Sequence, residues 1–167
     1  MQASRARYQI RCGPGGTIHD YVPFYLGPRS VMLYQLHTGW VAGYNEGQAP
    51  IVYAVTSLRR VEASGRPWVF SDGHGLARLT HWYDDPASLD RVDWETVNGN
   101  QWNDTNADPD RQRRKQAELL VHEHLPWSAL AGFGVLDDAV RKQVESILQA
   151  NPATAGTPVK AKPAWYY

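Results

Sequence analysis

The sequence predicts an α+β fold in a single domain that spans residues 1–167. Segments typical of β-strands and segments typical of α-helices both occur, but they do not alternate regularly, as a doubly wound parallel sheet requires. The composition fits one packed domain, because 43% of the 167 residues are hydrophobic and 20% are charged. These observations favour α+β over a repeating α/β arrangement.

The first part of the chain is expected to hold an edge strand and a helix. Residues 19–25 are rich in aromatic side chains but include Pro23, which lacks an N–H, and this pattern indicates an irregular segment or an edge strand. Pro28 suits the first turn of a helix and Gly39 suits a helix end. A helix is therefore expected over residues 29–36.

The middle of the chain is expected to contain two strands, a helix and a loop. Residues 51–55 and 68–70 are short β-rich runs that predict strands. Apolar residues at helical spacing predict a helix over residues 88–98, with Ser88 as its N-cap. Residues 99–110 are rich in Asn, Asp and Gly and are expected to form a loop.

For one segment in the last third of the chain, the sequence does not decide between a strand and a helix. Residues 115–121 end in a short apolar stretch, which suits either a buried strand or a helical turn. Residues 133–136 predict a further strand, and Asp137 is expected to cap a helix that continues to about residue 148. The aromatic tail, residues 159–167, is expected to be extended.

The charge balance excludes strong attraction of the whole molecule to nucleic acid. Lys plus Arg and Asp plus Glu number 17 each, so the formal net charge is zero. Nucleic acid would have to bind at a local basic patch. The 7 Trp and 9 Tyr, against 3 Phe, are amphipathic rings that suit stacking on flat ligands, although most of them are expected to fill the core.

The single cysteine, Cys12, favours a reducing compartment, because no intramolecular disulfide can form. The sequence shows neither a signal peptide nor an apolar run of membrane-spanning length, so a cytoplasmic protein without membrane contact is expected. No group of His, Cys, Asp and Glu has the spacing of metal ligands, and no metal is expected.

Several segments match a known family in order and in spacing along essentially the whole chain. The most specific is residues 114–121, Arg-Lys-Gln-Ala-Glu-Leu-Leu-Val, followed by Pro126 and Trp127. The others are residues 15–25, 28–34, 47–51, 69–75, 93–95 and 165–167. Together these segments resemble the DarT family of bacterial ADP-ribosyltransferase toxins.

The resemblance implies a fold, an activity and partners. The fold is expected to be an ADP-ribosyltransferase-like split β-sheet with flanking helices. The activity is expected to be transfer of ADP-ribose from NAD, as substrate, to a base in single-stranded DNA, because a base must be unstacked to be modified. Thymidine is the expected acceptor and guanosine the alternative. The protein is expected to act as a toxin, with a cognate antitoxin that reverses the modification as its partner.

One departure from the family pattern concerns the start of the chain. Family members usually begin with a further segment, which carries a His-containing motif that contacts NAD. This motif is absent from the sequence, so the chain is expected to be N-terminally short. The alternative function is therefore a remnant that binds nucleic acid without transferase activity.

The resemblance assigns the key carboxylate to Glu118. Positive charge develops at C1′ of the ribose as nicotinamide leaves, and a fixed carboxylate can hold the ribose 2′-hydroxyl and stabilise that charge. From its neighbours alone, Glu118 is equally a surface glutamate paired with Lys115 or Arg114.

Two further residues take catalytic or NAD-binding roles from the resemblance. Arg5 is expected to bind the diphosphate of NAD, because a guanidinium forms bidentate hydrogen bonds with phosphate oxygens. It is also expected to polarise the acceptor base. The alternatives are a flexible terminal charge at Arg5, or the same role for the nearby Arg7. His74 is expected to hydrogen-bond a base or a phosphate. Its alternative is a simple turn residue.

The resemblance also implies two segments that contact DNA. In the first, Met32 can pack against a base, and the alternative is that Met32, Leu33 and Leu36 form the core face of a helix. In the second, polar side chains and a Trp precede the basic run of residues 111–115, which suits single-stranded DNA. The alternative for this run is a solvated charged turn. The predicted DNA-binding residues are Arg29, Ser30, Val31, Met32, Leu33, Tyr34, Asn100, Gln101, Trp102, Asn103 and Arg114.

Overall fold

The computed structural model describes residues 5–167 and has the predicted α+β class. The chain forms two compact units, one made of Met1–Val31 with Gly65–Leu125 and the other of Met32–Ser64 with Pro126–Tyr167. Each unit contains its own β-sheet. The expected single domain stays a prediction. Within the described part of the chain, no helix is both long enough and apolar enough to cross a membrane.

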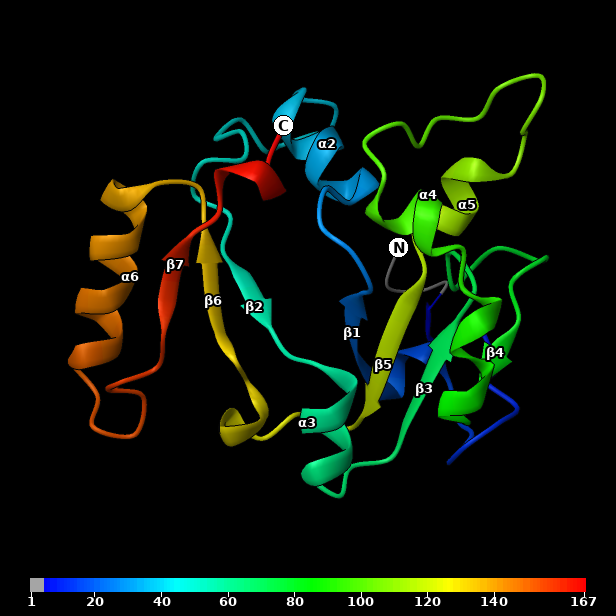
Figure 1. Ribbon diagram of the computed structural model, residues 1–167, viewed down its shortest axis with the longest axis horizontal. Coiled ribbons are helices and arrows are strands. Elements are labelled where there is room, and N and C mark those ends of the chain that lie inside the picture. Colours follow the sequence, from blue (N-terminus) through cyan, green and yellow to red (C-terminus); the bar gives the residue numbers. More distant parts are fainter. Residues whose placement is uncertain (1–4) are drawn as a thin grey trace. The chain divides into compact units, whose positions relative to one another are not determined.

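The first unit is built on a four-stranded antiparallel sheet. Its strands are β1 (Tyr21–Tyr25), β3 (Trp68–Ser71), β4 (Trp82–Tyr83) and β5 (Glu118–His122). Their order is β1-β5-β3-β4, so β5 lies between β1 and β3 (Figure 1). β1 is an edge strand, as the segment around Pro23 indicated, because proline is tolerated where a sheet ends.

The segment that could have been a strand or a helical turn forms strand β5. Residues Glu118–Val121 are all buried, and Leu120 packs in a core cluster with Ile10, Ile18 and Val69. A strand that is covered on both faces has no alternation of polar and apolar residues. The sequence pattern alone therefore could not separate this strand from a buried helical turn.

Two short helices replace the single helix predicted over residues 88–98, namely η2 (Pro86–Arg91) and α4 (Trp94–Asn98). Val92 separates them with extended backbone, at φ −80° and ψ 129°. Each helix is capped by an aspartate, Asp85 or Asp93, whose carboxylate accepts a backbone N–H of the first turn. The prediction of Ser88 as N-cap was wrong, because these carboxylates lie at the true helix starts.

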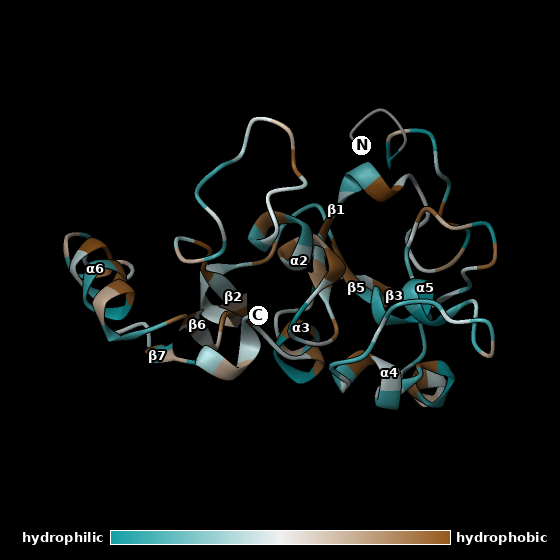
Figure 2. Ribbon diagram, turned by 90° about the horizontal axis from the view of Figure 1, so that it is seen from above, coloured by the Kyte–Doolittle hydropathy of each residue, from teal (hydrophilic) through white to brown (hydrophobic). Residues whose placement is uncertain are grey.

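The first unit also contains η1 (Ile18–Asp20) and α5 (Arg111–Lys115). Helix α5 carries the basic run and is hydrophilic, as its teal colour in Figure 2 shows. Residues 99–110 connect α4 to α5 without a helix or strand, as predicted. This connection, the loop 99–110, is separated from β5 by α5 and the two residues that follow it.

The second unit is built on a three-stranded sheet in the order β2-β6-β7. Its strands are β2 (Tyr53–Val55), β6 (Gly132–Val135) and β7 (Val159–Ala161). β6 runs antiparallel to β2 and parallel to β7. The strands expected near residues 51–55 and 133–136 are confirmed, and the tail forms β7 and a short helix. The helices are α2 (Val31–His37, which begins at the unit boundary), α3 (Leu58–Ala63), η3 (Trp127–Ala129), α6 (Asp138–Gln149) and η4 (Pro163–Trp165).

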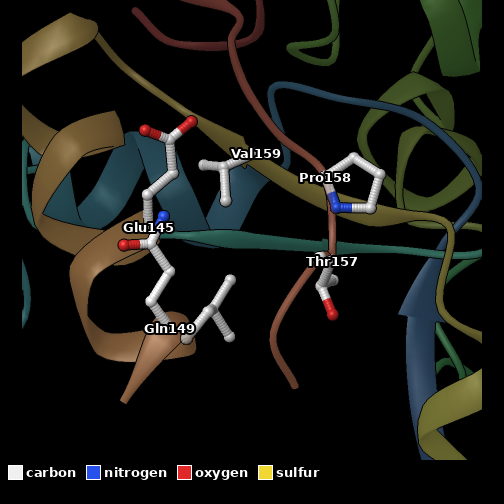
Figure 3. A pocket seen from close by; sticks show the side chains of 7 residues that line it. Glu145, Gln149, Thr157, Pro158 and Val159 are labelled. Atoms are coloured by element: carbon white, nitrogen blue, oxygen red, sulfur yellow. The ribbon is translucent and has the colours of Figure 1, made fainter. Parts of the chain in front are cut away.

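Helix α6 covers one side of this second sheet. Its N-cap is Asp137, as predicted, and the carboxylate accepts the N–H of Val140 at 2.9 Å. Leu148 packs with Val135 and Val159 of the sheet. A hollow of about 310 Å³ lies beside α6 and is lined by Glu145, Gln149 and residues 156–159, among others (Figure 3). None of the predicted site residues lines it.

Candidate active site

Glu118 is the first residue of β5 and is buried, with 4% of its surface exposed. Its backbone N–H donates to the Ser71 hydroxyl at 3.1 Å, and that hydroxyl donates to the carbonyl of Gly73 at 2.7 Å. Neither Lys115 nor Arg114 pairs with the Glu118 carboxylate, since both are bound elsewhere. The alternative of a surface glutamate paired with these residues is therefore excluded by the geometry.

The Glu118 carboxylate is held by a backbone amide and faces an arginine. The N–H of Gly75 donates to Oε1 at 3.4 Å, and Nη1 of Arg5 lies 3.7 Å from Oε2. Burial raises the pKa of the Glu118 carboxyl above its usual range, while the Arg5 charge and the Gly75 N–H oppose this rise. The carboxyl is thus more basic than an exposed glutamate.

Two buried polar atoms in this pair have no hydrogen-bond partner among residues 5–167. They are Oε2 of Glu118 and Nη2 of Arg5. Buried polar atoms are nearly always hydrogen-bonded in folded proteins, and an unmet group of this kind is costly. An acceptor and a donor that both lack partners fit a ligand with a hydroxyl and an anionic oxygen, such as a ribose diphosphate.

Tyr25 is a neighbour of Glu118 that the sequence reasoning missed. In the β1–β5 register, Tyr25 lies directly opposite Glu118. Tyr25 is 36% exposed as a whole residue, but desolvation of its phenol, followed by the charge of Glu118, raises the pKa of that phenol to about 12, although Arg5 acts in the other direction. The phenol therefore stays protonated at neutral pH. No local sequence signal marks it, because only the strand register places it there.

His74 lies in the turn after β3 and is held on several sides. Its backbone N–H donates to the carbonyl of Arg113 at 2.9 Å, and its own carbonyl accepts the Thr80 hydroxyl at 2.7 Å. Nδ1 accepts the N–H of Leu76 at 3.2 Å, so the ring proton is assigned to Nε2. Burial, and then the Arg5 charge, lowers the pKa of His74. The imidazole is thus neutral at pH 7 and offers one N–H donor.

The glycines that flank His74 allow this turn to pack closely. A Cβ at Gly73 would lie 2.9 Å from the Arg113 carbonyl oxygen. A Cβ at Gly75 would lie 3.0 Å from the indole of Trp82. Larger residues would therefore displace the backbone whose N–H holds Glu118. The Asp-Gly-His-Gly sequence serves to bring the amide of Gly75 to the carboxylate.

The arginines of α5 are engaged in ion pairs within the first unit. Arg113 pairs with Asp110 at 2.7 Å and with Asp72 at 2.8 Å. Arg114 pairs with Asp108 at 2.7 Å and with Asp93 at 2.8 Å, as well as with Asp110 at 3.5 Å. The basic run is thus largely neutralised, and the contact of Arg114 with DNA stays a prediction.

Lys115 is a buried lysine, with 3% of its surface exposed. Its ammonium donates to the carbonyls of Val97 at 2.7 Å and Gly99 at 2.9 Å. Burial, and then the charge of Arg29, lowers the pKa of Lys115 to about 8. Lys115 therefore fixes the start of the loop 99–110 to the segment that leads into β5.

The predicted DNA-binding residues differ in exposure. Met32 is 45% exposed, whereas Trp102 is 9% exposed, so its indole offers little surface for stacking in this conformation. Leu33 is 1% exposed and forms part of the core, which supports the alternative given for it. Asn100, Gln101 and Asn103 are exposed, Arg29 and Tyr34 are half-buried, and Ser30 and Val31 are buried.

Comparison with known proteins decides the family. The family model described as "ssDNA thymidine ADP-ribosyltransferase, DarT" matches residues 1–167. The chain belongs to the DarT family. A DNA ADP-ribosyl transferase of Thermus aquaticus is 36% identical over 167 residues, which cover 100% of this chain and 72% of that relative. The predicted family and enzyme class, an NAD-dependent DNA ADP-ribosyltransferase, are therefore confirmed.

Solved structures of DarT from Thermus sp. 2.9 share the fold. The complex with ADP-ribosylated ssDNA has a TM-score of 0.93 at 35% identity and covers 99% of this chain and 78% of that chain. The complex with NAD+ has a TM-score of 0.91 at 35% identity, and the match covers 98% of this chain and 81% of that chain. The predicted ADP-ribosyltransferase-like fold class is confirmed, and NAD is the substrate bound by a DarT relative. Among residues 5–167, no group of His, Cys, Asp and Glu could hold a metal ion.

Proposed function

We propose that this chain transfers ADP-ribose from NAD to thymidine in single-stranded DNA. The observation that carries the proposal is the buried Glu118 carboxylate, whose Oε2 has no hydrogen-bond partner among residues 5–167 and lies 3.7 Å from Nη1 of Arg5. The family description supports the acceptor base. Structures of the Thermus sp. 2.9 relative with NAD+ and with ADP-ribosylated ssDNA support the two substrates.

Glu118 acts on the ribose from which nicotinamide leaves. The bond between C1′ and nicotinamide breaks, nicotinamide leaves with the electron pair, and positive charge develops at C1′. The carboxylate accepts a hydrogen bond from the ribose 2′-hydroxyl, and its negative charge stabilises the positive charge at C1′. A ring nitrogen of the base then bonds to C1′ and loses its proton. The Glu118 carboxylate, whose pKa is raised by burial, takes up that proton.

Arg5 and His74 hold the charged and polar parts of the two substrates. The unpaired Nη2 of Arg5 suits an oxygen of the NAD diphosphate, because guanidinium groups bind phosphates tightly and stay charged. The Nε2–H of His74 suits a carbonyl of the base or a phosphate oxygen. Both residues keep the roles that the resemblance assigned to them.

A Glu118→Gln variant tests the catalytic assignment. Glutamine keeps the size and the acceptor for the Gly75 N–H but cannot carry the negative charge, so transfer should fall by roughly 10²–10³ or more. Mass spectrometry of a thymidine-containing oligonucleotide after incubation with NAD measures the transfer. The matched control is Glu46→Gln, an exposed glutamate that should leave transfer unchanged. Normal transfer by Glu118→Gln would refute the assignment.

Homopolymer oligonucleotides separate thymidine from guanosine as acceptor. Modification of oligo-thymidine alone supports the proposal, and modification of oligo-guanosine alone contradicts it. Titration of the purified chain with NAD tests the remaining alternative, a nucleic-acid-binding protein without transferase activity. Saturable binding supports the enzyme, and no binding at millimolar NAD supports that alternative.

The same activity in a bacterial cell would make the protein a toxin that acts on DNA in the cytoplasm. Its partner would be an antitoxin that removes ADP-ribose from the modified base. Expression of the chain should stop growth, and expression of Glu118→Gln should not. Growth arrest that persists in the Glu118→Gln variant would contradict this role.

A further inference from the structure

An open hollow of about 580 Å³ lies in the first unit, and neither Glu118 nor Arg5 lines it. Its walls come from the segment that follows Arg5 and from the start of β4. The lining includes Arg7, Tyr8, Arg11, Cys12, His81 and Trp82. The catalytic assignment above uses none of these side chains.

The two arginines of this hollow differ from the arginines of α5. Arg7 and Arg11 are exposed, and neither forms an ion pair within residues 5–167. The acidic groups nearby are already engaged. Asp84 accepts the N–H of Gly13 at 2.7 Å, and Asp72 pairs with Arg113. The hollow thus presents two guanidinium groups that form no ion pair within residues 5–167, although the carboxylate of Asp84 lies near enough to add to the rise that burial causes in the pKa of the Cys12 thiol.

The aromatic side chains of the hollow connect it to the Glu118 site. The rings of Tyr8 and Trp82 lie with their centroids 6.4 Å apart. The indole of Trp82 also packs against Gly75, whose N–H donates to Glu118. The indole N–H of Trp82 is buried and has no partner among residues 5–167. One side chain therefore borders both the hollow and the turn that holds the carboxylate.

We propose that this hollow binds backbone phosphates of the single-stranded DNA next to the modified nucleotide; this proposal rests on the function proposed above. Exposed guanidinium groups form charge-assisted hydrogen bonds with phosphate oxygens, and such contacts position a strand without reading its sequence. The aromatic face beside them suits an unstacked base. The open shape suits a strand that passes across the surface. The diphosphate of NAD has the same chemistry, so the test separates the two.

The test compares oligonucleotide binding by two double variants made in the Glu118→Gln background, and binding is measured without NAD, so that no transfer occurs during the measurement. Arg7→Ala with Arg11→Ala removes the two cations of the hollow. Arg59→Ala with Lys142→Ala removes the same charge from exposed positions of the second unit. Fluorescence anisotropy gives the affinity for a single-stranded oligonucleotide over a range of salt concentrations.

The expected result is a loss of about 25-fold in affinity at 0.1 M salt for the Arg7/Arg11 variant, with a salt slope smaller by about 1.4. Each phosphate contact on a single strand contributes about 0.7 to that slope. The control variant should match the parent protein. An unchanged slope in the Arg7/Arg11 variant overturns the proposal. Weaker NAD binding together with unchanged oligonucleotide binding also overturns it, because the phosphate would then belong to NAD.

Cys12 gives an independent test of location, because it is the only cysteine and it lines the hollow. A bound oligonucleotide should slow the alkylation of Cys12, with half of the effect at the measured dissociation constant, while NAD should not. Alkylation that is unaffected by saturating oligonucleotide places the strand elsewhere and overturns the proposal.

The failure of this subsite and the failure of the proposed function give different results. If the wild-type chain modifies oligonucleotides but the Arg7/Arg11 variant keeps the parent salt slope, the subsite is wrong and the function stands. If the wild-type chain modifies none but the slope falls as expected, the function is wrong and the phosphate site stands.

Discussion

Glu118 lies where burial and charge act against each other. Burial favours the neutral form of its carboxyl, whereas Arg5 and the Gly75 N–H favour the ionised form. Burial has the larger effect, so the pKa is raised. A carboxylate with a raised pKa accepts a proton more readily than an ordinary one, which suits the proposed reaction, because that reaction ends with a proton released from the base. Burial of this carboxylate therefore costs the fold some stability at a pH where the group is ionised.

Replacement of Glu118 by Gln should stabilise the fold at neutral pH. The raised pKa means that the folded state binds the carboxyl proton more tightly than the unfolded state. The wild type therefore loses stability as the pH rises from the usual glutamate pKa through the raised one. The variant should have the higher Tm above this window and a nearly equal Tm below it.

Thermal unfolding by circular dichroism at a series of pH values measures this difference. Glu46→Gln is the control and should show no such trend, since Glu46 is exposed. A Tm of Glu118→Gln that is lower than that of the wild type at pH 7 would contradict the expected balance between burial and Arg5.

At the scale of elements, α5 acts as an internal clamp. Arg114 binds Asp93, which caps α4, and also Asp108 and Asp110 at the end of the loop 99–110. Lys115 binds the carbonyls at the start of the same loop. Both ends of the loop are thus tied to the short helix that leads into β5. The charges on α5 hold the site's neighbours in place more than they present a basic surface.

Lys115→Met should loosen the start of this loop. The carbonyls of Val97 and Gly99 lose their donor, which costs about 1–3 kcal/mol for a buried group left unsatisfied. Hydrogen exchange should become faster near Val97 and Gly99, and the KM for the oligonucleotide should rise more than kcat falls. Lys142→Met, at an exposed position of α6, is the control.

The pH dependence gives a second readout for Lys115. Its folded pKa is lowered to about 8 from the model-compound value of 10.5. The wild type therefore gains stability as the pH rises between these values, because the cost of the buried charge disappears. Lys115→Met lacks this gain. A stability difference between the two proteins that stays constant from pH 7 to 11 would rule out this account.

At the scale of the whole molecule, zero net charge and a neutralised α5 leave few cations for DNA. Proteins with six to ten phosphate contacts lose roughly 10³–10⁵ in affinity between 50 and 200 mM salt. This chain should lose less than about 10² over that range. A salt titration of oligonucleotide binding measures the loss, and a drop of 10³ or more would show that many more phosphates are contacted.

The fold class and most element positions could be predicted from the sequence, because they depend on local patterns. The cap at Asp137 and the edge position of the Pro23 segment are examples. The break at Val92 could not be predicted, because apolar spacing continues across it. Contacts between residues far apart in the sequence determine the element boundaries that local patterns do not predict.

The candidate site shows the same division. The resemblance marked Glu118, Arg5 and His74, and the structure brings Arg5 within 3.7 Å of Glu118. The position of Tyr25 depends on strand register, which no local pattern reports. Arg114 is paired with Asp108 and Asp110, which precede it closely in the sequence, but also with the distant Asp93, which only the fold brings to it.

The clamp of α5 on the loop 99–110 has a consequence for how this family can diversify. Because the anchors lie at the two ends of the loop, the exposed residues between them, such as Asn100, Gln101 and Asn103, carry no part of the support for Glu118. Substitutions at these exposed positions should therefore leave the contacts of Glu118 unchanged. On the function proposed above, the DNA preference can then change in this segment without any change at the carboxylate.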